Sequence, residues 1–418
     1  MGEWLGRQVE IEVTNVAHGG VAVARHEGRV IFVSDAIPGE IVIARITDDS
    51  KKSFWRAETL SVVTPSEHRR PHVWSAASID RAPSDRAGGA EFGHIDIAHQ
   101  RELKRQVLAD SLKRMAGIET RVTVDALPGE ENGTGWRTRL RLQVAADGTP
   151  GPYAARSHRV ITVTEVPLAT PEVAAIAPLD EKFVGMDHVD IVVPSVGNPY
   201  VLAGTGSRTE KHRAQRIVER VGEREFRLDA RGFWQVHRHA AETLTRAVQE
   251  AIEESLFDPR AANLDLYGGV GLLAAAVGDR FGNHLRITTV ESDSLSTDHA
   301  AENLAEWVGA AAVTARVENY LRQLGSSAGA SDRARIGRGT VILDPPRAGA
   351  GTAVVRELVA LDPAQIVYVA CDPVALARDV ALFGAAGYEL TRLRAFDLFP
   401  NTHHVEAVAT LVKPKRAE

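Results

Sequence analysis

The sequence predicts an α/β protein whose C-terminal half is a Rossmann-like domain, preceded by an OB-type β-barrel and a central β-rich domain. After Thr243, short apolar runs alternate with helix-length segments, a pattern typical of a parallel sheet covered by helices on both faces. A glycine-rich turn at 268–271 directly follows the first of these runs, as in nucleotide-binding folds. The chain before them is rich in short β-type runs broken by glycine and proline.

Residues 1–63 are expected to form a small closed barrel. Their β-rich runs are Val9–Val13, Val21–Ala24, Arg29–Val33, Glu40–Ile46 and Phe54–Leu60. Turn residues separate them, including His18-Gly19-Gly20 and Pro38-Gly39. Barrels of this type often bind nucleic acid, although a docking or spacer barrel would show the same pattern.

Residues 64–232 are expected to form the central domain. Apolar residues at helical spacing, from Leu103 to Met115, predict one amphipathic helix over 96–118. Further β-type runs follow at Arg139–Val144, Arg159–Val163 and His188–Val193.

Residues 233–418 are expected to form the α/β domain. Its predicted strands are Asn263–Leu266, Arg286–Val290, Ala311–Val317, Thr340–Leu343, Gln365–Ala370 and a closing strand, Val405–Val412.

Composition narrows the classes of protein that the chain can represent. A length of 418 residues favours two or three domains. The polar N-terminus and the lack of a long apolar run predict a cytoplasmic protein. A single cysteine excludes an intramolecular disulfide and any multi-cysteine metal site. The net charge of −6 does not by itself indicate a nucleic-acid binder.

The glycine-rich turn indicates an adenosine-type cofactor. Gly269 and Gly271 let the backbone approach a ligand closely, and Glu291 ends the next predicted strand, where an acid would bind ribose hydroxyls. A dinucleotide cofactor fits the same local pattern, as does a tight turn with a surface glutamate.

A second acidic motif, Asp344-Pro345-Pro346-Arg347, follows another buried strand. At the carboxyl edge of a parallel sheet, Asp344 would face the ligand crevice. The two prolines stiffen the loop that holds this acid. Enzymes that methylate planar bases often carry such an element, and a plain dehydrogenase does not need it.

The only cysteine, Cys371, comes directly after a predicted strand, at the same sheet edge. Free cysteine is often a small buried hydrophobe, but here the chemistry favours a nucleophile. A thiolate that adds to carbon 6 of uracil makes carbon 5 able to attack a sulfonium methyl group. A base must then remove the proton from carbon 5. His403, His404 and Glu406 are all candidates for this base, and paired histidines can also indicate a metal.

Together these segments resemble the RNA (uracil-5-)-methyltransferase family, over nearly the whole chain. The nucleophile motif of the family is similar to the segment around Cys371-Asp372-Pro373, and its general-base motif is similar to His404-Val405-Glu406. The resemblance therefore implies Cys371 as nucleophile, Glu406 as base and Asp344 as the acid between cofactor and target base.

The same resemblance implies S-adenosylmethionine as cofactor and a class I methyltransferase fold. The cofactor contacts that it implies are Gln235, Tyr267, Gly269, Gly271, Glu291, Asn319 and Asp344. The N-terminal barrel is similar to the TRAM module, and the helix at 96–118 is expected to pack on the catalytic domain.

The chain departs from relatives that hold an iron–sulfur cluster through four cysteines. Ala90 and Val166 stand where two of those cysteines are expected, so no such cluster is predicted and the central domain must be held by packing alone. Leu272 replaces an asparagine of some relatives and is assigned no contact.

The sequence therefore predicts methylation of uridine carbon 5 in structured RNA, by a monomer. Family analogy favours ribosomal over transfer RNA. The alternatives are a methyltransferase for a base amine, which needs no thiolate, an RNA-binding or RNA-folding protein with a vestigial pocket and, more remotely, a nicotinamide dehydrogenase.

Overall fold

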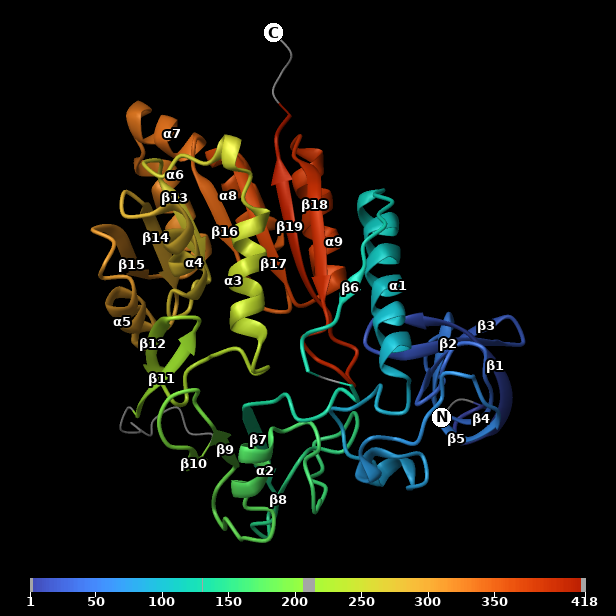
Figure 1. The fold of residues 1–418 in the computed structure, drawn as a ribbon. Coiled ribbons are helices and arrows are strands. Elements are labelled where there is room, and N and C mark those ends of the chain that lie inside the picture. Colours follow the sequence, from blue (N-terminus) through green and yellow to red (C-terminus); the bar gives the residue numbers. More distant parts are fainter. Residues whose placement is uncertain (1–2, 130, 206–214, 415–418) are drawn as a thin grey trace.

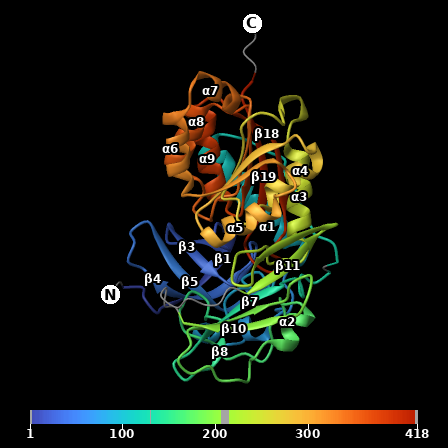
Figure 2. The ribbon, with the colours of Figure 1, turned by 90° about the vertical axis from the view of Figure 1, so that its left-hand side faces the viewer.

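The computed structural model describes residues 3–129, 131–205 and 215–414. Figure 1 shows three parts: an N-terminal barrel, a central β-rich domain and a large C-terminal α/β domain. A view turned by 90° places the barrel and the central domain together below one end of the α/β sheet (Figure 2). Expected fold class and observed architecture agree.

The barrel closes in the order β1-β2-β3-β5-β4. Its strands are β1 (Gln8–Ala17), β2 (Val21–His26), β3 (Arg29–Ser34), β4 (Ile41–Asp48) and β5 (Phe54–Thr64). Alternate residues face inward, so that Val13, Ile31 and Trp55 are buried in one apolar core. The alternation of apolar and polar residues along each strand therefore gives the barrel an apolar interior and a polar outer face.

The central domain is built on a sheet in the order β10-β9-β7-β8 and a hairpin of β11 and β12. The elements are β7 (Arg139–Val144), β8 (Pro150–Gly151), α2 (Pro171–Ile176), β9 (His188–Val192), β10 (Tyr200–Gly204), β11 (Arg216–Val221) and β12 (Arg224–Asp229). Short 3-10 turns, η1 (Ser75–Ala77) and η2 (Pro83–Asp85), precede them. Ala90 and Val166 are both buried in the apolar core of this domain, beside Trp136. Apolar side chains thus occupy two positions that hold cluster cysteines in the relatives that the sequence resembles.

The expected strand at Arg159–Val163 is wrong. Only an isolated bridge joins Val160 to Tyr153 there. The neighbouring chain carries Pro150 and Pro152, which lack backbone N–H donors, so no continuous ladder can form.

A long helix, α1 (Ile97–Ala116), links the barrel to the α/β domain. It ends at Gly117, whose φ of 68° suits glycine, and it packs against α9 (Pro373–Ala385) through Leu108 and Leu112. The chain then adds β6 (Val124–Asp125) to the edge of the large sheet, parallel to β18 (Glu389–Phe396). Residues 97–125, which lie within the sequence range expected for the central domain, therefore pack on the α/β domain and extend its sheet.

The large sheet has eight strands in the order β15-β14-β13-β16-β17-β19-β18-β6. Its further strands are β13 (Asn263–Leu266), β14 (Arg286–Glu291), β15 (Gly309–Thr314), β16 (Thr340–Leu343), β17 (Gln365–Ala370) and β19 (Glu406–Val412). The helices between them are α3 (Ala240–Ala251), η3 (Glu254–Leu256), α4 (Leu272–Phe281), α5 (Ser294–Asn303), α6 (Val317–Ser327), α7 (Ala330–Gly337) and α8 (Gly351–Leu361). The strand expected over 311–317 starts earlier and ends at Thr314, because α6 already begins at Val317.

Two apolar cores flank the sheet. One is covered by α3 and α4, and the other by α6, α8, α9 and α1. Strand β17 contributes to both, since Val367 and Val369 face one core while Ile366 and Tyr368 face the other. No helix within the described ranges is both long and apolar enough to cross a bilayer.

Candidate active site

The sheet topology brings the predicted catalytic residues to one edge. Strands β13, β16 and β17 are parallel, so the glycine turn, Asp344 and Cys371 all follow carboxyl ends of neighbouring strands. Strand β19 runs antiparallel to β17, with Ala370 opposite Ala407, so Glu406 begins its strand next to the position of Cys371. Chain segments that are far apart in sequence thus form a single cluster.

Burial and neighbouring charges shift the pKa values of all three groups of this cluster. Burial raises the pKa of the Cys371 thiol to about 12, with further increases from Glu406 and Asp344, while Arg347 lowers it. Burial, and then the charge of Asp344, raises the pKa of Glu406 well above its usual range. Burial raises the pKa of Asp344 to about 7, with a contribution from Asp265. A thiol and two carboxyls therefore share one water-poor site.

Asp265, at the end region of β13, lies fully buried beneath the glycine turn. A Cβ on Gly268 would stand 2.5 Å from Asp265 Oδ2, so only glycine allows the turn to close over this acid. Thr289 donates to Oδ2 at 3.3 Å, while Oδ1 has no hydrogen-bond partner. Burial raises the pKa of Asp265 to about 7. A buried acceptor without a donor is costly, which indicates a place for a polar or cationic ligand group.

The predicted cofactor contacts around the turn are close together. Gly269 donates its backbone N–H to Glu291 Oε2 at 3.2 Å, while Glu291 Oε1 accepts from the backbone N–H of Asp293 at 2.9 Å. Gly271, with a φ of 89°, precedes α4. Tyr267 has a φ of 63°, which is rare for a residue with a side chain, and is half-buried beside the turn.

The other two predicted cofactor contacts, Gln235 and Asn319, lie on segments outside the glycine turn. Gln235 is partly buried next to Trp234, on the segment that leads into α3. Asn319 is exposed on the first turn of α6, where its side chain accepts a long hydrogen bond of 3.5 Å from Arg322.

The loop that carries Asp344 is anchored to the helix that follows Cys371. Asp379 of α9 accepts hydrogen bonds from the Ala350 backbone at 2.8 Å and from the Tyr368 hydroxyl at 2.7 Å. Arg378 donates to the Ala348 carbonyl at 2.7 Å. Because one helix holds both loops, the acid and the nucleophile keep a fixed relation.

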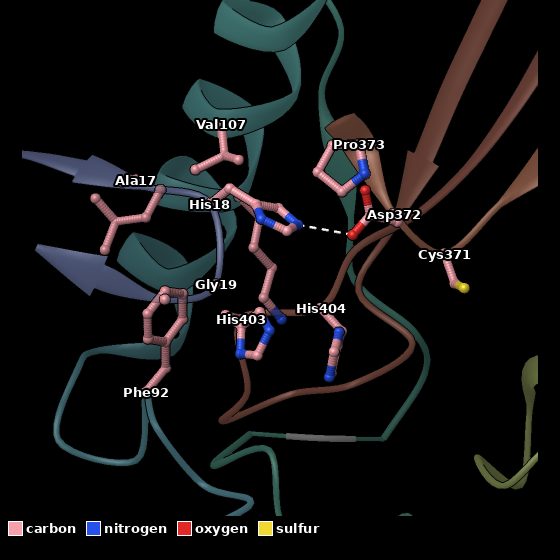
Figure 3. A pocket seen from close by; sticks show the side chains of 13 residues that line it. Ala17, His18, Gly19, Phe92, Val107, Cys371, Asp372, Pro373, His403 and His404 are labelled. Atoms are coloured by element: carbon pink, nitrogen blue, oxygen red, sulfur yellow. Dashed lines mark hydrogen bonds and ion pairs between the residues drawn. The ribbon is translucent and has the colours of Figure 1, made fainter. Parts of the chain in front are cut away.

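The two candidate histidines lie on the other side of the nucleophile loop. His403 and His404 line a narrow pocket with His18 of the barrel, and the Cys371 sulfur points away from that pocket (Figure 3). Burial, followed by the nearby His403, lowers the pKa of His404 to about 3, so it stays neutral. Within the described residues, no group of three or more His, Cys, Asp or Glu could hold a metal ion.

Fold and site define a methyltransferase that uses S-adenosylmethionine. The family model described as tRNA (Uracil-5-)-methyltransferase matches residues 262–414, and that of the TRAM domain matches residues 4–57. An RNA methyltransferase of uncharacterised function from Streptomyces avermitilis is 35% identical over 97% of this chain and 98% of its own length. One from Bifidobacterium longum is 30% identical over 97% of each chain.

The fold is also similar to a solved structure from Pyrococcus abyssi. It is a tRNA (uracil-54, C5)-methyltransferase in complex with S-adenosyl-L-homocysteine. The two structures match with a TM-score of 0.69 and 21% sequence identity, over 97% of this chain and 100% of the other. The chain belongs to the RNA methyltransferases of the tRNA (uracil-5-)-methyltransferase family that carry an N-terminal TRAM domain.

Sequence reasoning missed several residues that the structure places at or behind this site. Asp265 and Arg347 lie within motifs that the sequence singled out, but neither was assigned a role. The sequence marked His18 only as part of a turn and gave no sign of its contact with Asp372, which lies 354 residues away.

Proposed function

We propose that the chain methylates carbon 5 of a uridine in structured RNA through a covalent adduct with Cys371. The observation that supports this most is the cluster of Cys371, Glu406 and Asp344 at the carboxyl edge of the sheet. An amine methyltransferase would have no use for the thiol in this cluster.

Asp265, buried beneath the glycine turn, and the half-buried Glu291 fit a site for S-adenosylmethionine. We assign the ribose to Glu291, the approach of the backbone to Gly269 and Gly271, and a positively charged group to the unpartnered oxygen of Asp265. Tyr267, Gln235, Asn319 and Asp344 would complete the binding site. When bound, S-adenosylmethionine supplies an electrophilic methyl group on a positively charged sulfur.

Attack by Cys371 requires its proton to leave first. The thiol is protonated near neutral pH in the free protein, since its pKa is about 12. Asp344, with a pKa of about 7, is a neighbouring carboxylate that can take this proton. The sulfur then bonds to carbon 6 of uracil, and the electrons of the C5–C6 double bond move towards the oxygen on carbon 4.

Glu406 closes the cycle as general base. After carbon 5 has gained the methyl group, the Glu406 carboxylate takes the proton from carbon 5. The freed electron pair restores the C5–C6 double bond, and the bond from carbon 6 to sulfur breaks. A raised pKa makes the ionised Glu406 a strong base for this step.

We propose that RNA reaches the site along the central domain. A groove there is lined by Arg137, Arg141, Arg231 and Phe233. Phe233 is 72% exposed, although it directly precedes the buried Trp234. Guanidinium groups beside an exposed ring are suited to phosphates and stacked bases. Burial, followed by the charge of Arg347, lowers the pKa of Arg137, and Arg347 also lowers that of Cys371, which connects this groove to the Cys371 edge.

Trapping on RNA that contains 5-fluorouridine tests the proposal. Fluorine on carbon 5 cannot leave as a proton, so wild type with S-adenosylmethionine should form an RNA adduct that survives denaturing electrophoresis. Cys371→Ala should form none. Glu406→Gln should still form the adduct, and should also accumulate one on ordinary uridine RNA.

Sequencing the trapped RNA would identify ribosomal or transfer RNA as the substrate. If wild type binds cofactor and RNA but gives no adduct, the proposal falls. Methyl transfer to an amine would then favour a base-amine enzyme, and no transfer at all a role in RNA binding. We further propose that the active form is a monomer, which light scattering at assay concentration would check.

A further inference from the structure

The barrel makes a direct contact with the loop that carries the nucleophile. His18 lies in the turn between β1 and β2, and its Nε2 is 2.7 Å from Asp372 Oδ2 (Figure 3). Asp372 is the residue directly after Cys371. The two partners come from separate domains, and the His18 side chain remains 47% exposed.

Asp372 divides its two carboxylate oxygens between the catalytic domain and the barrel. Oδ1 caps α9 by accepting from the backbone N–H groups of Val374 at 3.0 Å and Ala375 at 2.8 Å. Oδ2 accepts from His18. The bond to the barrel therefore helps to orient the side chain that fixes the first turn after the nucleophile.

The same turn of the barrel also packs on the loop before Glu406. A Cβ on Gly20 would stand 2.6 Å from His403 Cβ, so the backbone of the turn lies directly against that loop. The other charged or titratable groups that line the space around His18 are Lys104 and Arg114 of α1, His403 and His404. Of the other acids nearby, Asp397 is paired with Lys104 and Glu91 Oε2 lies 3.6 Å from His403 Nδ1, so Asp372 is the acid that faces His18.

We infer that His18 is a positioning residue for the Cys371 nucleophile, so that the RNA-binding barrel forms part of the support of the catalytic loop. The inference rests on the proposed role of Cys371. It adds that the barrel acts on the thiol itself, and not only on the binding of RNA.

Charge gives this contact a measurable effect on the thiol. Asp372 contributes to the raised pKa of Cys371, so a protonated His18 paired with Asp372 offsets that contribution. The hydrogen bond to Asp372 raises the pKa of His18. Below this raised pKa the histidine is charged, and the pair favours the thiolate. Above it the histidine is neutral, and the benefit is lost.

Alkylation of Cys371 by iodoacetamide provides the test, because the chain has no other cysteine. Rates would be followed by mass spectrometry from about pH 6 to about pH 9, a range that spans the histidine titration. His18→Gln can still donate to Asp372 but carries no charge, and His18→Ala lacks both features. His26→Ala changes another histidine of the same barrel and is the matched control.

Both His18 variants should react about three- to tenfold more slowly than wild type at low pH, with the difference vanishing at high pH. His18→Ala should also slow adduct formation at saturating 5-fluorouridine RNA more than His18→Gln does. His26→Ala should match wild type in alkylation. Because half of the His18 ring is in solvent, His18→Gln is expected to keep its thermal midpoint, and it decides the test if His18→Ala unfolds.

Equal alkylation of wild type and His18→Gln at every pH, or a change in RNA affinity alone, would overturn the inference. The alkylation measurement needs no RNA, so it is independent of methyl transfer. A wild type that alkylates as expected but never methylates would contradict the proposed function while leaving the His18 effect on the thiol established.

Discussion

Replacing Lys104 of α1 tests how the loop that leads to Glu406 is held. Its ammonium donates to Asp397 Oδ1 at 2.5 Å and to the Phe399 carbonyl at 3.0 Å. The side chains of the pair are 0% and 2% exposed. Asp397 Oδ2 already lacks a partner, so Lys104→Met would leave a buried carboxylate with no counter-charge.

The expected loss is about 3–5 kcal/mol in the free energy of unfolding, the usual cost of removing one member of a buried ion pair. Urea titrations followed by tryptophan fluorescence would measure it. The double variant Lys104→Met/Asp397→Leu should recover most of the loss, because it removes both charges together. Lys113 lies on the same helix as Lys104 and forms an exposed ion pair with Glu119, so Lys113→Met should leave the urea midpoint unchanged.

A loss below about 1 kcal/mol for Lys104→Met would refute the reasoning, since it would mean that the carboxylate finds water or a proton at little cost. A loss that the double variant does not reverse would also contradict it.

Two further predictions concern the cofactor and the RNA. Because burial raises the pKa of Asp265 from 3.8 to about 7, the free energy of unfolding falls as pH rises between these values. At about pH 8, Asp265→Asn should therefore exceed wild type in free energy of unfolding by at most about 4 kcal/mol and melt at a higher temperature. The same variant should bind S-adenosylmethionine more weakly. Equal melting curves, or unchanged cofactor affinity by calorimetry, would contradict this assignment. Phe233→Ala should weaken RNA binding by about 1–3 kcal/mol in filter-binding assays while leaving the thermal midpoint and cofactor affinity as they are, and unchanged RNA affinity would remove the groove from the proposed path.

The parts of the fold that sequence could predict are those with a strong local period. Thr340–Leu343 and Gln365–Ala370 are strands as expected, because continuous apolar runs of that length are buried on both faces. Strand β18 was not predicted. Its residues Arg392 and Arg394 interrupt the apolar pattern, since the strand lies near the sheet edge and is partly exposed.

The placement of the candidate site was predictable for a topological reason. Carboxyl ends of parallel strands meet at one edge, so motifs after β13, β16 and β17 had to come together. The supports of the site follow no such rule. Lys104 and Asp397 are separated by 293 residues, and His18 and Asp372 by 354, so no local pattern could connect them.

The most direct measurement of the central claim is release of tritium from RNA labelled at carbon 5 of uridine, compared with transfer of a labelled methyl group. Methylation of carbon 5 through Cys371 predicts one tritium released to water for each methyl transferred, and neither event with Cys371→Ala. Methyl transfer with the tritium retained, or equal release by Cys371→Ala, would contradict the account.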